Sequence, residues 1–233
     1  MDKYIKCIIL VLLLTNTACH TNTNEFQLQI GDLLFQDLDS SPLCDAIELV
    51  TPGYKNANLS HIGIVVEVVN PYCTNNPDYN YKNHIKILEA IPNKVKTTRL
   101  DSFLSRSLDY NKNPKVIVGR LKPEYQHTIK DAISFLISKK NKKYDNAFLM
   151  NNDAYYCSEL IFNAFEKHKI FKIQPMTFLD PKNNKTLKIW EDYYQDLKIK
   201  IPEGEPGLNP GNMSLSKKID IIHYYGIPSG MEE

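Results

Sequence analysis

The amino-acid sequence predicts an α+β fold in which a central antiparallel sheet packs against helices. Apolar runs rich in β-branched residues, such as 60–69, are typical of strands, whereas 123–140 repeats its apolar residues at helical spacing. The strand-like runs of the first half are joined by loops of limited length, which favours antiparallel pairing. Because no strong linker divides the chain, we expect one domain over 27–233, in which 170–233 form a C-terminal extension of undefined role.

The composition is that of an ordinary soluble protein. Apolar residues make up 42% of the 233 residues and charged residues 24%, which is enough for a sizeable core. The formal net charge is +1, so electrostatics gives no argument for a nucleic-acid partner or for an acidic polymer.

The first residues differ from the rest of the chain. Lys3 and Lys6 precede an apolar run over 7–14 that is too short to span a bilayer, and small and polar residues follow. This pattern predicts a signal peptide over 1–19 and export. The ending "TNTAC" resembles a bacterial lipobox, which implies lipidation of Cys19 and anchoring to a membrane of the cell envelope.

Two features of this leader leave an alternative open. Asn16 stands where a lipobox usually has Leu, so plain cleavage near Ala18 would instead give a soluble exported protein. In either case the polar residues 20–26 read as a tether. Export leaves three cysteines in the mature chain, and an odd number leaves at least one free thiol; whether two of the three form a disulfide stays open. The three are Cys44, Cys73 and Cys157.

The first elements after the tether are a strand and a helix. We expect the strand over 32–35, opened by Gly31, and the helix over 40–51 with Pro42 in its first turn. Ser40 or Ser41 is its expected cap, and Pro52-Gly53 ends it. The expected apolar face of this helix consists of Ala46, Ile47 and Val50.

Three further strands are expected in the first half of the chain. They cover 60–69, 84–91 and 115–121, and a polar loop separates the first two. The run 97–108 reads as a short helix capped near Asp101. The strand 60–69 is apolar almost throughout, which predicts burial on both faces.

The second half is dominated by helical patterns. An amphipathic helix is expected over 123–140, and another begins near Cys157. The pattern weakens after Ile170, although 186–197 can form a helix. The turn-rich stretch 201–212 reads as a surface loop, and 217–226 reads as a last strand or a short helix.

Cys157 lies at the start of the stretch "CSELIFNAF", where Asp153 is a candidate N-cap or N′ residue. A helix N-terminus carries positive partial charge and free N–H groups, which stabilise a thiolate and can hold an oxyanion. The alternative is a small side chain packed under the helix, or half of a disulfide. The helical stripe behind it consists of Leu160, Ile161, Ala164 and Phe165.

Glu89 interrupts an apolar strand face. Alternation along 84–91 places this carboxylate in line with Ile85, Ile87 and Ile91. Buried acids usually have a partner and often a function. The alternative is an edge position or a different register.

His61 opens the apolar strand 60–69, and alone it would read as a structural histidine. Together with a cysteine and a polar orienting residue, a histidine forms a nucleophilic triad, whose members need proximity in space only. The sequence contains neither a CxxC pair nor an HExxH helix, so it predicts no metal site, and nothing in it calls for a cofactor.

The stretches "IGDLLF", "SHIGIVVEV" and "ILEA" together resemble one half of the NlpC-type cell-wall cysteine peptidases, which have a papain-like fold. "YDNAFLMNNDAYYCSELI" resembles the other half. The two halves stand in reversed order, with the histidine before the cysteine. This order resembles the circularly permuted, YiiX-like branch of papain-like enzymes, and the resemblance covers residues 27–170.

The resemblance implies a role for each matched residue. Cys157 would be the nucleophile, His61 the general base and Glu89 the orienting residue, although ordinary members have His, Asn or Gln at the third place. Tyr144 would help the backbone N–H of Cys157 to stabilise the oxyanion, or it is simply a core tyrosine. Ser60 and Asp32 would play supporting roles.

These implications lead to three hypotheses. The first is an exported cysteine hydrolase that cleaves an amide bond, possible substrates being peptidoglycan peptides. The second keeps the triad but acts as an amidase or acyltransferase on a lipid. The third is a non-catalytic binding lipoprotein with an ordinary thiol. The substrate and the oligomeric state are not defined by the sequence.

Overall fold

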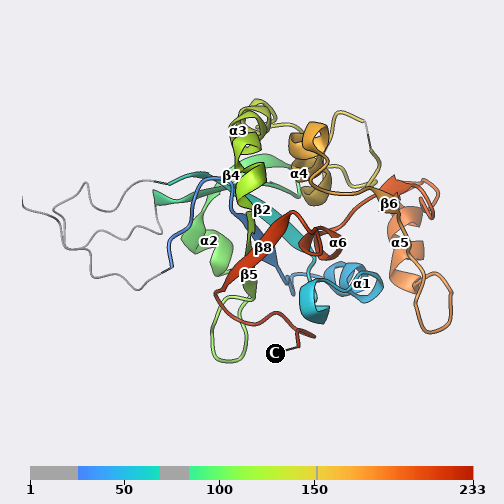
Figure 1. Ribbon diagram of the computed structural model, residues 1–233. Helices are drawn as coiled ribbons and strands as arrows, with labels where there is room; N and C mark the ends of the chain where they lie inside the picture. The colour runs from blue at the N-terminus through green and yellow to red at the C-terminus, as the bar shows by residue number, and fades with distance from the viewer. Residues whose placement is uncertain (1–25, 69–83, 151, 233) are drawn as a thin grey trace, which may run out of the picture.

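A six-stranded antiparallel sheet forms the centre of the computed structural model (Figure 1), which describes residues 26–68, 84–150 and 152–232. The strand order is β4-β3-β2-β1-β5-β8, and every neighbouring pair is antiparallel. The predicted α+β class with a central antiparallel sheet is therefore confirmed. The strands are β1 (Leu33–Gln36), β2 (His61–Glu67), β3 (Lys86–Ile91), β4 (Lys94–Arg99), β5 (Val116–Leu121) and β8 (Ile219–Tyr224).

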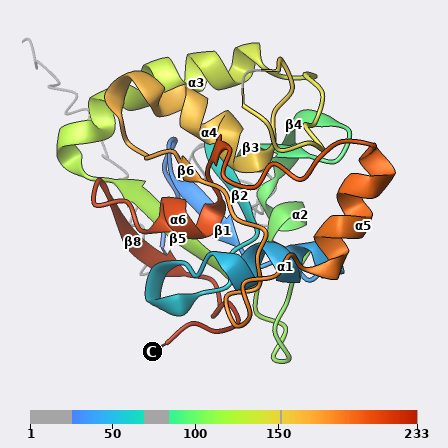
Figure 2. The same ribbon diagram turned by 90° about the vertical axis from the view of Figure 1, so that its right-hand side faces the viewer.

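Helices lie against this sheet and beyond its end. They are α1 (Pro42–Val50), α2 (Leu100–Leu104), α3 (Ile129–Ser138), α4 (Cys157–Phe165), α5 (Lys188–Leu197) and α6 (Pro210–Ser214). Short 3₁₀ turns cover Tyr54–Asn56, Pro123–Thr128 and Glu166–His168, and β6 (Gln174–Pro175) pairs with β7 (Pro206–Gly207). In the view of Figure 2, α1, α5 and α6 face the reader, with α3 and α4 above them.

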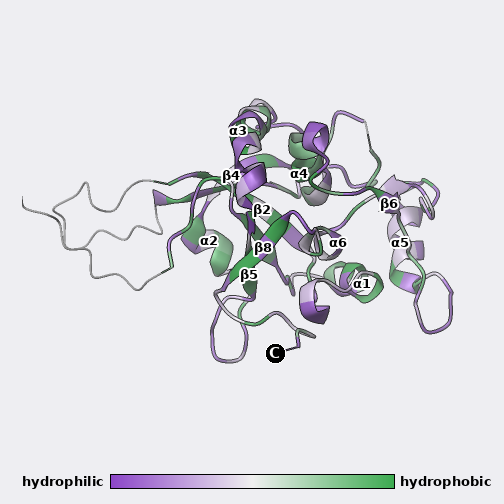
Figure 3. Cartoon of the chain, viewed as in Figure 1, coloured by the Kyte–Doolittle hydropathy of each residue, from purple (hydrophilic) through white to green (hydrophobic). Residues whose placement is uncertain are grey.

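Strand alternation divides the core into two layers. Leu33 and Phe35 of β1 pack with the residues of α3 and α4, whereas Leu34 packs with those of α2. In β3, Leu88 belongs to the first layer and Ile87 to the second. Hydrophobic residues accordingly concentrate on the central strands and α2 in Figure 3. A third, aromatic cluster joins α1 to α5 and consists of Ala46, Phe178, Trp190 and Tyr194.

Strand β4 is absent from the sequence prediction, which placed only a helix over 97–108. The structure forms a tight hairpin in which Ile91 pairs with Lys94 across Pro92 and Asn93, and α2 begins after the strand at Leu100. Asn93 adopts φ 90°, a conformation that Asn tolerates better than most residues. The Pro-Asn pair was the available turn signal.

Three other expectations need correction. The helix expected over 123–140 begins as a 3₁₀ turn and becomes α3 only at Ile129. In α1 the residues buried against the protein include Glu48, not only the expected apolar face. The stretch 201–212 contains β7 and the start of α6 and is partly buried, so it is not simply a surface loop. The last ambiguous segment is a strand, β8.

None of the described helices combines the length and the apolar character that a bilayer crossing requires. The predicted signal peptide over 1–19, Cys19 and the tether up to residue 25 lie outside the described residues, as does Cys73.

Candidate active site

Helix α4 begins at Cys157. The residue before it, Tyr156, is extended (φ −88°, ψ 169°) and is the N-cap, so the predicted first-turn position of Cys157 is confirmed. Asp153 is not the cap, because it lies upstream and its carboxylate pairs with Lys142. The thiol is buried and free, and the positive end of the helix favours its thiolate form.

His61 is the first residue of β2 and is buried. Its imidazole is a hydrogen-bonding partner of the Cys157 sulfur, and the backbone N–H of Ile62 also donates to that sulfur. The ring lies beside Phe103 of α2, with 5.8 Å between ring centroids. The first residue of strand β2 therefore contacts the first residue of helix α4.

Glu89 lies on β3 and is fully buried. Its Oε2 is 2.7 Å from Nε2 of His61, which leaves Nδ1 as the ring nitrogen that faces the sulfur. The alternation argument holds, since Ile85 and Ile87 belong to the layer that packs on α2. The structure thus brings Cys157, His61 and Glu89 together.

Two further side chains contact the Glu89 carboxylate and were missed by the sequence analysis. Arg106 donates through Nη1 to Oε2 over 2.7 Å and through Nη2 to Oε1, and Thr98 Oγ1 also donates to Oε1. Thr98 lies on β4, the strand that was not predicted. A buried acid demands a cationic or hydrogen-bonding partner, but the sequence alone does not say which one.

These contacts set the charges of the site. Burial alone would raise the pKa of Glu89, but Arg106 and His61 outweigh it and lower this pKa from 4.5 to about 2. Burial would likewise lower the pKa of His61, whereas its bonds to Cys157 and Glu89 raise it from 6.5 to about 9. Burial raises the pKa of the Cys157 thiol, and the hydrogen bond and charge of His61 overcome that effect and lower it. Both shifts favour a thiolate beside an imidazolium over a thiol beside a neutral imidazole.

Tyr144 reaches the same site. It forms an isolated β-bridge with Tyr155, just ahead of α4, and it lines the pocket that contains Cys157. Burial and the negative charge of Cys157 hold the pKa of Tyr144 well above its usual range, so its hydroxyl stays a proton donor.

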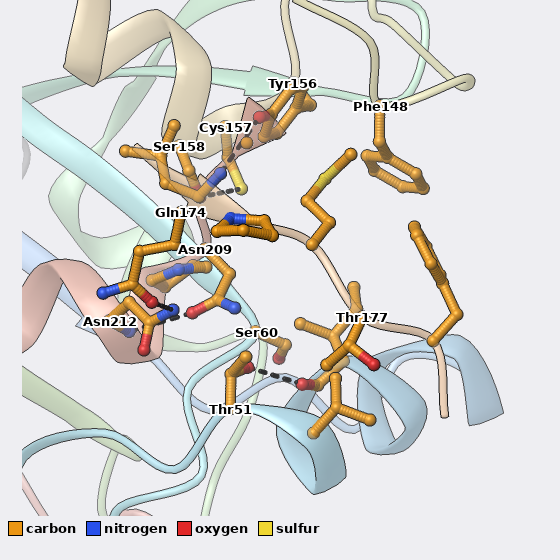
Figure 4. A pocket seen from close by; sticks show the side chains of 18 of the residues that line it. Thr51, Ser60, Phe148, Tyr156, Cys157, Ser158, Gln174, Thr177, Asn209 and Asn212 are labelled. Atoms are coloured by element: carbon orange, nitrogen blue, oxygen red, sulfur yellow. Dashed lines mark hydrogen bonds between the residues drawn. The ribbon is translucent and has the colours of Figure 1, made fainter. Parts of the chain in front are cut away.

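A pocket of about 340 Å³ opens beside Cys157 (Figure 4). Gln174, Asn209 and Asn212 lie on one side of it and Phe148 on the other. Among the described residues that line it, none is Asp, Glu, Lys, Arg or His. Its apolar lining includes Ile47, Val50, Phe148, Met176, Phe178 and Trp190.

The C-terminal region therefore takes part in the site. Trp190 comes from α5, Gln174 from β6 and Asn212 from α6, and the Asn212 side chain donates to Oε1 of Gln174 over 2.9 Å. The sequence pattern gave no role to 170–233, because its turn-rich stretches are typical of surface loops.

Ser60 and Asp32, which were expected to play supporting roles, lie in different parts of the structure. Ser60 lines the pocket, and its Oγ accepts from the Leu38 backbone N–H over 3.0 Å. Asp32 lies away from the pocket lining, where Arg120 holds it through two bonds of 2.7 Å, and its carboxylate also accepts from Gln29 N–H over 2.7 Å. Asp32 thus ties down the turn that precedes β1.

The comparisons with known proteins agree on the fold. The family model described as permuted papain-like amidase enzyme, YaeF/YiiX, C92 family, matches residues 27–223. The crystal structure of the metalloprotein YiiX from Escherichia coli O157:H7 is similar, with a TM-score of 0.66 and 21% sequence identity. The match covers 87% of this chain and 100% of that one. No curated protein matches the chain significantly.

The bacterial relative is described as a metalloprotein, which raises the question of a metal in this chain. Within 26–68, 84–150 and 152–232, no group of three or more His, Cys, Asp and Glu side chains is arranged to hold a metal ion. In the described region Glu89 instead pairs with both His61 and Arg106. The described residues do not fit a metal centre.

Proposed function

The chain belongs to the C92 family of permuted papain-like amidases and is a cysteine hydrolase, and on this premise we propose that it is exported and cleaves an amide bond through a thioester acyl-enzyme. The observation that carries the proposed cleavage is the hydrogen-bonded row of Cys157, His61 and Glu89, of which Cys157 lines the pocket.

The proposed reaction begins with the thiolate of Cys157. Its sulfur attacks the carbonyl carbon of the substrate, and the resulting tetrahedral intermediate collapses as the C–N bond breaks. The leaving amine takes its proton from the imidazolium of His61. Water, deprotonated by His61, then attacks the thioester, releases the carboxylic acid and restores the thiolate and imidazolium. Glu89 holds the ring in the orientation that both steps need.

Oxyanion stabilisation falls to the start of α4 and to Tyr144. The backbone N–H of Cys157 belongs to the free donors of a helix N-terminus, and a protonated tyrosine hydroxyl is a second donor of suitable kind. The raised pKa of Tyr144 supports this role, because the hydroxyl keeps its proton beside the negatively charged sulfur.

For the substrate, peptidoglycan peptides are the first candidate. This assignment rests on the predicted export and on the predicted anchor at Cys19, which would place the enzyme in the cell envelope. The amide side chains of Gln174, Asn209 and Asn212 supply donors and acceptors suited to a peptide backbone.

A lipid amide or ester is the second candidate, and the pocket lining favours it. An apolar, uncharged wall that includes Phe148, Phe178 and Trp190 suits an acyl chain better than the carboxylates of a peptidoglycan peptide. The non-catalytic hypothesis predicted an ordinary thiol, and the lowered pKa of Cys157 argues against it.

The test compares purified muropeptides with N-acyl amides as substrates for the wild-type chain and for Cys157→Ala. We expect product release by the wild type with one of the two classes and its loss, by a factor of about 10³ or more, in the variant. Cys44→Ala, which removes the other described free thiol, should keep the wild-type rate. Full turnover by Cys157→Ala would refute the mechanism.

A further inference from the structure

Arg106 lies just after α2 and faces the buried end of the site. Its guanidinium makes two parallel hydrogen bonds to the two oxygens of Glu89, while about a quarter of its side chain (24%) is exposed. It also lies over the ring of Phe103, 5.1 Å from the centroid. This ring is the one that flanks His61, so Arg106 is held by the same elements that hold the imidazole.

With Arg106 included, the buried groups form a row of alternating charges. The thiolate of Cys157 is followed by the imidazolium of His61, the carboxylate of Glu89 and the guanidinium of Arg106. The net charge of these four groups is zero when the sulfur is ionised. Without the guanidinium, the neutral row would consist of a thiol, an imidazolium and a carboxylate, because one cation cannot balance two buried anions.

We propose that Arg106 is a positioning residue of the catalytic site, which orients Glu89 against His61 and supplies the charge that allows Cys157 to stand as a thiolate. This inference rests on the proposed function, since it assigns a task within the same row of side chains. Arg106 itself does not contact the sulfur; it acts through Glu89 and His61.

Other titratable groups face Cys157 as well. Burial is the largest cause of the raised pKa values of Tyr144 and Tyr156, and the charge of Cys157 raises both further. The charge of Glu159, on α4, also raises the pKa of Tyr156. Both tyrosines stay neutral near pH 7 and lack the positive charge that could replace Arg106. In this part of the described structure His61 and Arg106 are the cations that act on the row.

A purely structural role would leave the thiol unaffected, and the chain offers a matched control. Arg120 also makes two hydrogen bonds to a carboxylate, through Nε and Nη2 to Asp32, whereas Arg106 uses Nη1 and Nη2. The exposed fractions are similar, 22% and 1% for the Arg120 and Asp32 side chains against 24% and 0% for Arg106 and Glu89. Removing either arginine leaves a buried carboxylate without its guanidinium, but only Arg106 adjoins the proposed site.

The experiment follows the alkylation of Cys157 by iodoacetamide in the full chain as a function of pH, with the modified peptide quantified by mass spectrometry. Arg106→Gln should move the apparent titration midpoint of Cys157 upward by about one pH unit or more, and Arg106→Lys by a smaller amount. Arg120→Gln should leave the midpoint where it is in the wild type.

The outcomes separate this inference from the proposed function. A wild-type midpoint near the ~8.5 of a free cysteine would refute the proposed function itself. A low wild-type midpoint that Arg106→Gln leaves unchanged would overturn only the role of Arg106. If Arg106→Gln does not fold, Arg106→Lys is compared with Arg120→Lys, and equal midpoints in those two variants would overturn the inference.

Discussion

Glu89 is a fully buried carboxylate that contacts three side chains, those of His61, Thr98 and Arg106. An isolated buried charge would be expensive, but each oxygen of this one accepts hydrogen bonds and a guanidinium lies beside it. The residue is therefore stable only as a member of its network. Removing one member leaves the others buried without compensation.

We predict that Glu89→Gln lowers the free energy of unfolding by about 3 kcal/mol near pH 7, because the amide cannot accept both bonds from Arg106. The pKa of Glu89 falls from 4.5 to about 2 on folding, so the unfolded chain binds more protons between these values. The wild type should therefore lose this stability as pH falls from 4.5 towards 2. Urea unfolding at several pH values checks this, and equal acid slopes for the two proteins would contradict it.

The burial of Glu48 is the least expected feature of α1. The side chain is buried, and burial together with nearby Asp37 and Asp45 raises its pKa from 4.5 to about 7, although a bond to Ser60 opposes this. The sequence placed Ile47 and Val50 on the buried face, but the structure uses these two to line the pocket. Helix α1 therefore buries the carboxylate of Glu48 against the rest of the protein, whereas Ile47 and Val50 line the pocket.

Glu48→Gln should stabilise the chain above pH 7. Because the pKa of Glu48 rises on folding, the native chain holds the proton between pH 4.5 and about 7, and stability falls as pH rises through that interval. The neutral amide of the variant does not titrate, so this loss of stability does not occur. We expect its free energy of unfolding above pH 7 to exceed that of the wild type by about 1 kcal/mol, with solvent screening allowed for. Thermal melting at pH 5 and pH 8 checks this, and a variant that is no more stable at pH 8 would rule it out.

At the level of elements, the sequence predicted the strands and helices that have a clear local pattern of apolar residues. The strands around His61 and Glu89 and the first turn of α4 follow from apolar alternation and helical spacing. Strand β4 was missed because Lys94, Lys96 and the threonines of an edge strand carry no apolar stripe. With β4 unseen, Thr98 could not be placed beside Glu89.

What the sequence could not reveal depends on contacts between distant segments. Arg106 gives no local signal, since an arginine after a short helix is ordinary. The reversed order of the histidine and cysteine motifs did predict the permuted papain-like fold, because each motif keeps its internal residue spacing in a circular permutation. The contribution of 170–233 to the pocket lining depends on packing against distant segments, which no local sequence pattern shows.

On the scale of the whole molecule, the C-terminal region is joined to the site by close packing. Gly211, in α6, lies against the end of α1, where an added Cβ would approach the Thr51 carbonyl oxygen to 2.2 Å. The neighbours of Gly211, Pro210 and Asn212, line the pocket, and so does Thr51. Any displacement of α6 therefore changes the shape of the pocket.

We expect Gly211→Ala to push α6 away from Thr51, to destabilise the chain by about 1–3 kcal/mol and to raise KM for the active substrate. Gly204→Ala is the control, since Gly204 belongs to the same region, lies outside the pocket lining and has no atom within 4 Å of an added Cβ. Its positive φ makes it a mildly destabilising change too. If both variants showed the same KM as the wild type, the coupling of α6 to the pocket would be refuted.

The placement of the pocket bears on the two substrate candidates. The described chain begins on one side of the molecule, and α5 and β6 lie on the opposite side (Figure 1). If Cys19 carries a lipid, as predicted, the seven-residue tether 20–26 reaches at most about 25 Å. The pocket-lining elements would then lie on the side away from the anchoring bilayer, which favours a substrate that arrives from the solvent side.

The central claim is that Cys157 and His61 act as one chemical unit, and the rate of iodoacetamide labelling at Cys157 at pH 6 tests it most directly. We expect ready labelling in the wild-type chain and a rate at least about tenfold lower in His61→Ala, because a loss of one pKa unit of thiolate stabilisation has that effect. Equal labelling rates in the two proteins, with both folded, would contradict the account.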